Sequence, residues 1–259
     1  LLNCGRRQDF FGLKRSSGRK RCVIRWSSQL HFLSPKEAIC GEIIEIFRNL
    51  GSPFIADGMQ RLGLPRRIVD PSLRPLIPNK SIAGTVVTLL LDFFPEEPIT
   101  PREYAFANAF KQAKTVASPV LVAESRLGLR SPFGGGASRS FVHAGLTGVI
   151  IDGPIRDIVD VTNQGMQMFH RTISADSFVI PKLPEGYVGT EAEVAVNVGG
   201  VIAQPGELVV ADVDGIVFCP VKDAPAVIAA AHEVLAEEEA IFKKWDDGED
   251  YLQALGLND

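Results

Sequence analysis

The sequence predicts a layered α/β domain, and two patterns along the chain support this. Short apolar runs rich in Val and Ile alternate with helix-like segments in the first two thirds of the chain, and closely spaced strands follow in the last third. With 24 glycines and 17 prolines among 259 residues, the chain has enough turn-forming residues for many short elements. We therefore expect strands alternating with helices early, a β-meander late, and one buried core.

In the first half, a helix is expected from Pro35, with Ser34 as its N-cap, and the Gly-Ser-Pro sequence over 51–53 ends it. The β-branched run over 82–91 predicts a buried strand. The other expected elements of this half are a short helix over 54–62, a helix over 101–117, a strand over 119–123 and a helix over 137–144.

In the second half, a strand is expected over 148–153, where a Gly-Pro turn ends it, and a short helix over 156–163. Glycine and proline turns separate the later apolar runs, which predicts closely spaced strands. These closely spaced strands are expected over 194–198, 201–203, 208–211 and 216–219, after a separate strand over 168–173 and before a long helix over 224–245 that is rich in Ala and Glu.

The net charge of −4 is unevenly distributed along the chain. Residues 1–30 hold eight Lys and Arg against one acid, Asp9, whereas the rest carries 19 basic and 30 acidic residues. An acidic body lacks the basic face that binds a phosphate backbone, so we expect no nucleic-acid partner. No apolar run approaches the roughly 18–20 residues that cross a bilayer, so we expect no membrane partner.

The basic segment over 1–33 is expected to be a disordered leader ahead of one folded domain over 34–259. Three explanations stay open for it. The first is a disordered leader or an artefact of the gene model. The second is an organelle transit peptide, because the segment is rich in Arg and Ser and poor in acids. The third is a functional arm that binds nucleic acid or directs localisation. We expect a cytoplasmic protein, or a mitochondrial one if 1–33 is a transit peptide.

Several residues with reactive side chains are expected to be structural. Neither His143 nor His170 has a matching catalytic partner, and the DVDG sequence over 212–215 is typical of a turn between strands, although it could also be a metal-binding motif. The cysteines form no CxxC pair and no zinc-site spacing, so we expect free thiols in a reducing compartment. They are Cys4, Cys22, Cys40 and Cys219.

The densest candidate site is the sequence GVIIDGPIRD over 148–157. A buried strand leads to Arg156 and Asp157 at the start of a helix, which is where α/β folds often place functional groups. A guanidinium pairs bidentately with a carboxylate, and an aspartate offers the hard oxygen ligands that suit Mg²⁺ or Mn²⁺. By chemistry alone, a helix cap and a surface ion pair explain the two residues at least as well.

A second candidate site is the glycine triplet over 134–136, directly before an expected helix. Glycines there allow backbone amides to approach an anion at the positive end of the helix, while a flexible loop is the alternative. One helix and one strand separate the triplet from Arg156, so the two candidates could meet at the same mouth.

Three blocks of the sequence resemble RraA-like proteins, a family that includes divalent-metal 4-hydroxy-4-methyl-2-oxoglutarate aldolases. The first block joins Gly134-Gly135 to AGLTGVIIDGPIRD over 144–157. The second is VGGVIAQPGELVVADVDG over 198–215, and the third is IAGTVVT over 82–88. The resemblance extends from about Pro35 to Leu255, and it identifies the family more specifically than the substrate.

The resemblance implies a swivelling β/β/α layered domain, assembled as a homotrimer or a dimer of trimers with sites between subunits. Arg156 would bind the carboxylate of a 2-oxo acid, and the amides of Gly136 and Ala137 would hold its pyruvate moiety. Asp157 would hold Mg²⁺ or Mn²⁺ largely through water, and the cation would polarise the 2-oxo group. Glu239 would enter from a neighbouring subunit's C-terminal helix, unless it belongs to a solvated acidic face.

The implied activity is that of a lyase that cleaves a C–C bond of a 2-oxo acid to give pyruvate, by retro-aldol cleavage, oxaloacetate decarboxylation or both. The chain departs from the aldolase pattern at Gly135, where the aldolases carry an acid. This departure shifts our expectation toward decarboxylation.

The alternative function is a non-catalytic protein that regulates a ribonuclease by contact. Such relatives typically lack an intact Arg-Asp pair, which is present here as Arg156-Asp157. A methyltransferase, a label also used in this family, is not supported, because no glycine loop with a downstream acid indicates a nucleoside pocket.

Overall fold

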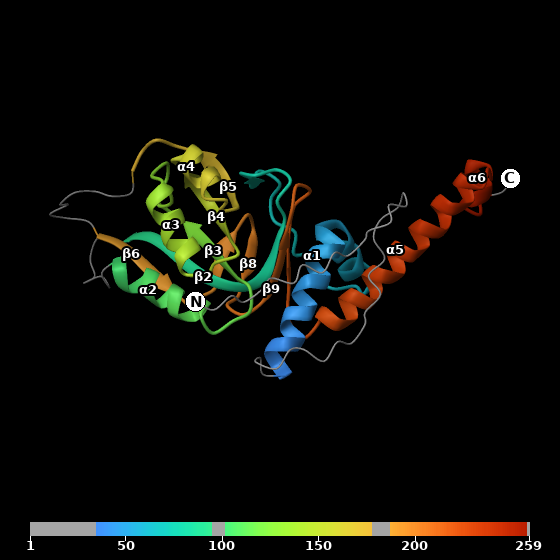
Figure 1. Cartoon of the computed structure of the whole chain (residues 1–259), viewed down its shortest axis with the longest axis horizontal. Helices are drawn as coiled ribbons and strands as arrows, with labels where there is room; N and C mark the ends of the chain where they lie inside the picture. The colour runs from blue at the N-terminus through green and yellow to red at the C-terminus, as the bar shows by residue number, and fades with distance from the viewer. Residues whose placement is uncertain (1–34, 95–101, 178–186, 258–259) are drawn as a thin grey trace, which may run out of the picture. The chain divides into compact units, whose positions relative to one another are not determined.

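The computed structural model describes residues 35–94, 102–177 and 187–257, and the expected leader over 1–33 lies outside them. Within these residues the chain forms a mixed α/β domain around an eight-stranded sheet, with a separate two-stranded hairpin (Figure 1). No helix in the described ranges is long and apolar enough to cross a membrane.

The sheet is organised around its longest strand, β2 (Ile82–Phe94). Its strand order is β1-β5-β4-β3-β2-β9-β10, and β6 pairs with the second half of β2. Strands β2 to β5 run parallel, while β1, β6, β9 and β10 pair antiparallel. The other strands are β1 (Arg74–Pro75), β3 (Pro119–Ser125), β4 (Gly148–Ile155), β5 (Met168–Ile173), β6 (Tyr187–Ala192), β9 (Leu208–Ala211) and β10 (Ile216–Cys219).

The two faces of the sheet are covered differently, because successive side chains of a strand point to opposite faces. Val87 and Leu121 pack against the layer of α2 (Arg102–Ala113), α3 (Gly135–His143) and α4 (Ile158–Asn163). Val86 and Val122 pack on the other face against the hairpin of β7 (Val196–Val198) and β8 (Val201–Ala203). The result is a hairpin, sheet and helix layering that agrees with the expected fold class.

A third apolar cluster joins β9 and β10 to the two longest helices, α1 (Pro35–Arg61) and α5 (Ala224–Asp246). Gly51, with φ 79°, kinks α1 where the sequence predicts a break between two helices. Asp212 accepts hydrogen bonds from the amide and hydroxyl groups of Ser52 just after the kink. Past this cluster, α5 leads away from α3 and α4 to the terminal helix α6 (Tyr251–Ala254), as Figure 1 shows.

Several elements differ from their predicted extents, and two of them illustrate the differences. The helix expected over 101–117 runs from Arg102 to Ala113, and a turn in which the amide of Thr115 donates to the carbonyl oxygen of Gln112 follows it. Ser118, with φ 46°, lies outside the helical region, as the residue before a proline tends to. The strand expected to end at Gly153 continues to Ile155 through a register shift against β5, which tolerates the missing amide hydrogen of Pro154.

Two acids near the ends of β3 and β4 fasten the β7–β8 hairpin to the sheet. Glu124 and Asp152 lie opposite each other in register. The amide of Asn197 donates to Glu124 at 2.7 Å, and the amide of Gly199 donates to Asp152 at 2.7 Å. Each acid also pairs with an arginine, Arg126 with Glu124 and Arg171 with Asp152. We call these two acids with their partners the hairpin latch.

Candidate active site

The candidate site forms where β4 ends and meets the start of α3. Phe133 makes a parallel bridge with Ile155, and its carbonyl oxygen accepts a hydrogen bond from the amide of Arg156 at 3.0 Å. This pairing places the glycine triplet beside Arg156 and Asp157. The two candidate motifs of the sequence therefore meet, as their spacing suggested.

Asp157 has an unusual backbone conformation and an unexpected hydrogen-bond partner. With φ 54° and ψ 42°, it is a non-glycine residue in the left-handed region, which costs free energy and often marks a functional position. Although it stands at the N-cap of α4, its carboxylate does not cap that helix. Instead, Oδ2 accepts the amide hydrogen of Gly135 at 3.0 Å and lies 3.7 Å from Nε of Arg156.

Two glycines of the triplet, Gly134 and Gly135, stand where a side chain would meet neighbouring residues. A Cβ atom at Gly134 would stand 2.5 Å from Oδ2 of Asp157 and 2.9 Å from Cγ of Arg156. A Cβ atom at Gly135 would stand 3.1 Å from Cβ of Asp160 and 3.2 Å from its Oδ2. An acid at 135, the residue type of the resembling aldolases, would therefore point toward a carboxylate that this chain already has.

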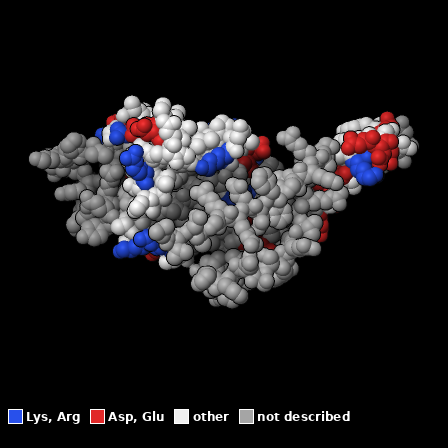
Figure 2. Space-filling view, in the orientation of Figure 1, with Lys and Arg blue, Asp and Glu red and all other residues white. Residues whose placement is uncertain are grey.

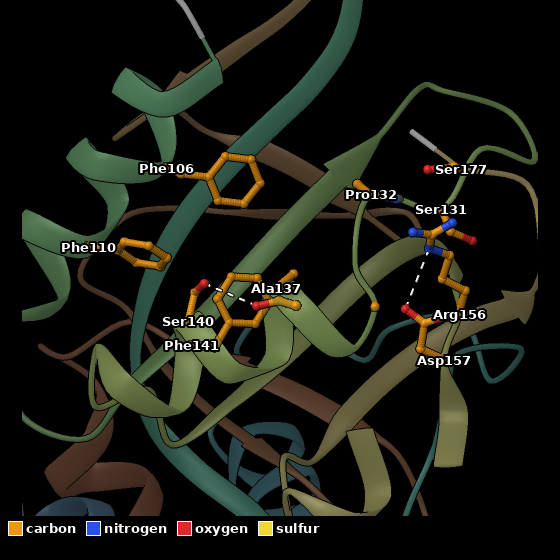
Figure 3. A pocket seen from close by; sticks show the side chains of 12 residues that line it. Phe106, Phe110, Ser131, Pro132, Ala137, Ser140, Phe141, Arg156, Asp157 and Ser177 are labelled. Carbon is orange, nitrogen blue, oxygen red and sulfur yellow. Dashed lines mark hydrogen bonds and ion pairs between the residues drawn. The ribbon is translucent and has the colours of Figure 1, made fainter. Parts of the chain in front are cut away.

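A cavity of ≈ 370 Å³ extends from this junction across α3 to α2 (Figure 3). The Arg156–Asp157 pair lies at one end, with side chains 33% and 42% exposed. At the other end lie the phenylalanines Phe106 and Phe110 of α2, with Phe141 of α3 beside them. The cavity thus has a charged end and an aromatic end.

The first turn of α3 supplies amides along the cavity wall, at Gly136 and Ala137. Amides in the first turn of a helix have no preceding carbonyl within the helix to accept their hydrogen. They carry the positive end of the helix dipole, which favours an anion. Arg156 and these amides could therefore hold one carboxylate or 2-oxo group between them.

The donor set of the cavity fits a hard, hydrated cation. Among the described residues, no three His, Cys, Asp or Glu side chains stand together as a metal-binding group. Asp157 is the one carboxylate among the described residues that line the cavity, which does not match the three or four protein ligands of zinc. Mg²⁺ retains several waters and is commonly bound through one or two carboxylates, so the residues fit that ion.

Glu239 does not join the Arg156–Asp157 pair within one chain. It is exposed on α5, outside the cavity, and Figure 1 shows α5 leading away from α3 and α4. Its acidic neighbour Glu237 instead binds Arg61, a hydrogen bond that lowers the pKa of Glu237. Figure 2 shows further acidic side chains gathered at the end of the chain, where α5 and α6 lie.

The other reactive residues have structural surroundings. His170 lies in β5, its Nδ1 contacts the carbonyl oxygen of Thr172, and burial lowers its pKa. Asp212 also accepts the amides of Asp214 and Gly215, which confirms the predicted turn. Cys219 is buried and free, and burial raises the pKa of its thiol to about 12, so it is no nucleophile at neutral pH.

The aromatic end of the cavity was not predicted from the sequence. Phe106 and Phe110 stand four residues apart, so helical periodicity places them on one face of the expected helix. The sequence holds no signal for the cavity that this face lines, because the other lining residues come from distant positions between Ser131 and Ser177.

Comparisons with known proteins agree with this fold. The RraA-like family model, described as Aldolase/RraA, matches residues 52–218. An uncharacterized protein of Methanocaldococcus jannaschii is 25% identical over 221 residues, which cover 85% of this chain and 96% of that protein.

Solved structures give the same result. Streptomyces coelicolor RraAS2, described as an unusual member of the RNase ES inhibitor RraA protein family, has a TM-score of 0.64 at 26% identity, over 77% of this chain and 94% of that one. An uncharacterized protein of Pseudomonas syringae pv. tomato has a TM-score of 0.64 at 22% identity, over 82% and 96% of the two chains, and shows the shared fold.

The layered sheet and the likeness to Streptomyces coelicolor RraAS2 define an α/β protein of the RraA fold. Because the family model covers more than half of the chain, the protein belongs to the RraA-like (Aldolase/RraA) family. That family includes both aldolases or decarboxylases and RNase E inhibitors.

Proposed function

We propose that this protein is a divalent-metal-dependent lyase that cleaves a C–C bond of a 2-oxo acid and yields pyruvate. One observation carries the proposal: Arg156, Asp157 and the first turn of α3 border a single cavity of ≈ 370 Å³. A guanidinium group, a carboxylate and helix amides lie together at one end of this cavity. Such groups can bind a substrate carboxylate next to a polarised carbonyl.

In this proposal, the chain's own residues hold and orient the substrate. Arg156 binds the C1 carboxylate, and the amides of Gly136 and Ala137 hold the pyruvate portion. The hydrogen bond from Gly135 to Asp157 fixes the carboxylate of Asp157 beside that position. Asp157 holds Mg²⁺ or Mn²⁺, largely through water. When bound, the cation supplies Lewis-acid stabilisation of negative charge on the 2-oxo oxygen.

The proposal also assigns Glu239 to the site of a neighbouring subunit in a homotrimer or a dimer of trimers. Glu239 is exposed on a helix that leads away from its own chain's cavity, so it can complete only another copy's site. The adjacent Glu238 is half-buried on the same helix and serves as a matched control.

The lyase proposal is tested by measuring pyruvate release from oxaloacetate and from 4-hydroxy-4-methyl-2-oxoglutarate, with Mg²⁺ and with EDTA. We expect turnover that EDTA abolishes and Mg²⁺ or Mn²⁺ restores. The variant Asp157→Asn should lose metal-dependent turnover, while Asp57→Asn, an exposed aspartate on α1, should keep it. If neither substrate yields pyruvate in a metal-dependent way, the lyase proposal fails.

The role of Glu239 is tested by mixing inactive variants. Arg156→Ala and Glu239→Gln subunits are each expected to be inactive, yet refolded mixtures should regain part of the activity, because some shared sites would have both residues intact. The control is a mixture of Arg156→Ala with Glu238→Gln subunits. Because Glu238→Gln subunits are expected to be active by themselves, this mixture shows how much activity arises without complementation between subunits. Lack of recovery with Glu239→Gln, in assemblies shown by mass to be mixed, would remove Glu239 from the site.

The alternative function is regulation of a ribonuclease by contact, which the likeness to Streptomyces coelicolor RraAS2 favours. The cavity that Arg156 and Asp157 border favours the lyase. An assay of RNase E-type cleavage with and without this protein decides for the alternative if inhibition persists in the Asp157→Asn variant and no pyruvate is released by the wild type.

A further inference from the structure

We propose that the aromatic end of the cavity is a subsite for an apolar group on C4 of the substrate. The substrate class would be 4-hydroxy-2-oxo acids with one carboxylate, at C1, and an apolar C4 substituent in place of a second carboxylate. This inference rests on the proposed lyase function and names the substrate class that the cavity fits.

The aromatic end is a preformed surface. Phe141 and Phe133 are fully buried, and their rings meet edge to face with centroids 5.0 Å apart. Phe106 stacks on Phe141 at 6.4 Å and Phe110 meets it edge-on at 6.0 Å. Unlike the two buried rings, Phe106 and Phe110 remain half-buried and line the cavity. They offer an apolar group a surface that the core already holds in place.

The charges of the cavity support the same class. Among the described residues that line it, Arg156 is the only cationic side chain, and it stands at the end opposite Phe106 and Phe110 (Figure 3). One carboxylate of a substrate can therefore pair with Arg156. A second carboxylate on C4, directed toward the phenylalanines, would lose water without gaining a cation among these residues, which is costly. An apolar group in that place gains free energy by burial.

The reaction balances without a further reactant. The C3–C4 bond breaks, its electron pair passes to C3 and the 2-oxo group, and C4 becomes the carbonyl carbon of an aldehyde or ketone. The proton of the C4 hydroxyl passes to solvent water, and C3 takes up one proton from water to give pyruvate. The apolar product then leaves from the aromatic end of the cavity.

Binding gives the first test, with two non-cleavable ligands that differ only at C4. By titration calorimetry with Mg²⁺, 2-oxo-4-phenylbutanoate should bind about tenfold more tightly than 2-oxoglutarate, with a more negative heat-capacity change. Phe110→Ala should remove most of this preference, and Phe110→Lys should reverse it. Phe242→Ala, at an exposed phenylalanine on α5 outside the cavity, should leave it unchanged. Equal binding, or a preference for 2-oxoglutarate, overturns the proposal.

Turnover separates this inference from the lyase proposal. Pyruvate release from 4-hydroxy-2-oxo-4-phenylbutanoate should exceed that from 4-hydroxy-2-oxoglutarate about tenfold in kcat/KM. If the dicarboxylate is cleaved as well or better, the lyase stands and the apolar subsite fails. If neither is cleaved and oxaloacetate is stable, but the phenyl ligand binds in a Phe110-dependent way, the subsite stands and the lyase fails. If Phe110→Lys changes only the oligomeric mass, the aromatic end is a subunit contact and the proposal is overturned.

Discussion

The hairpin latch and the Arg156–Asp157 pair both combine acids with arginines near strand ends. They differ in how many hydrogen bonds and ion pairs their carboxylates make within the protein. In the latch, Asp152 accepts the amide of Gly199 on one oxygen and pairs with Arg171 through the other, and its side chain is 20% exposed. At the cavity, Asp157 is 42% exposed, accepts one amide, and stands 3.7 Å from Nε of Arg156, beyond hydrogen-bond distance.

This difference indicates what each pair contributes. Acids whose oxygens all meet protein donors fix one element to another, and their removal leaves buried donors unpaired. An acid and an arginine that keep free bonding capacity at a cavity wall can bind something from outside the chain. The latch should therefore matter for stability, and the Arg156–Asp157 pair for ligand binding and turnover.

The largest effect is expected from Arg156→Ala on activity. Loss of a charge-assisted bond to the substrate carboxylate is worth up to about 3 kcal/mol, or about a hundredfold in kcat/KM for pyruvate release. The free energy of unfolding should change by less than about 0.5 kcal/mol, because the side chain is partly exposed and makes no close ion pair. Arg139→Ala, at an exposed arginine of α3 outside the cavity, is the control. A variant that loses stability as well as activity contradicts the separation.

The second effect concerns the latch. Asp152→Asn should lower the free energy of unfolding by about 1.5 kcal/mol, since the side chain at 152, which is 20% exposed, loses the charge that holds Arg171 and the amide of Gly199. Asp157→Asn is the matched change at the cavity, and it should cost less than about 0.5 kcal/mol because asparagine tolerates the left-handed backbone. Urea unfolding measures both. Equal losses in the two variants would mean that Asp157 is as structural as Asp152.

The sequence could not distinguish these two aspartates, although both lie in the block GVIIDGPIRD. The donors to Asp152 come from β5 and the β7–β8 hairpin, and only the tertiary fold brings them there. Strands marked by apolar runs and turns could be predicted, including β5, β8, β9 and β10 with their observed bounds. The strand β6 could not be predicted, because Gly189 and Thr190 interrupt its apolar pattern. The strand forms through its pairing with β2, which the sequence pattern does not indicate.

The same limit applies to the candidate site. Arg156, Asp157 and the glycine triplet were proposed from local motifs, and the structure brings them together through the bond from Arg156 to Phe133. The position of Asp160 against Gly135 depends on how α4 packs on α3, which no local pattern specifies. The aromatic end depends in the same way on the packing of α2.

The third prediction concerns Gly135→Asp, which adds an acid next to Asp157 and Asp160. The new Cβ would stand 3.1 Å from Cβ of Asp160, and two carboxylates would then repel each other. We expect a loss of about 1 kcal/mol in the free energy of unfolding, with roughly half recovered in the Gly135→Asp, Asp160→Asn double variant. The ratio of aldol cleavage to decarboxylation should rise if the acid at 135 sets the choice of reaction. An unchanged ratio with unchanged stability would make Gly135 a neutral position.

The smallest expected effect is on the pH dependence of stability, which should differ from the pH dependence of binding at Arg156. His170 lies beside the latch arginine Arg171, and burial lowers the pKa of His170 below its ordinary value of 6.5. The unfolded chain therefore takes up a proton at higher pH than the folded chain does. The stability that neutral His170 contributes is present above pH 6.5 and is lost as the pH falls below it.

Urea unfolding between pH 8 and pH 5.5 should accordingly show a decline that is shallower in His170→Gln, which keeps the size and polarity of the side chain but has no proton to gain. His143→Gln, at an exposed histidine on α3, should decline as the wild type does. His170 is next to Arg171 in β5, but alternation along the strand puts its side chain on the helix-facing side with Met168, away from the latch. Its protonation should therefore weaken the fold through β5 and leave binding at Arg156 to follow its own pH dependence. Parallel pH profiles for wild type and His170→Gln would show that the histidine does not contribute to the acid sensitivity of the fold.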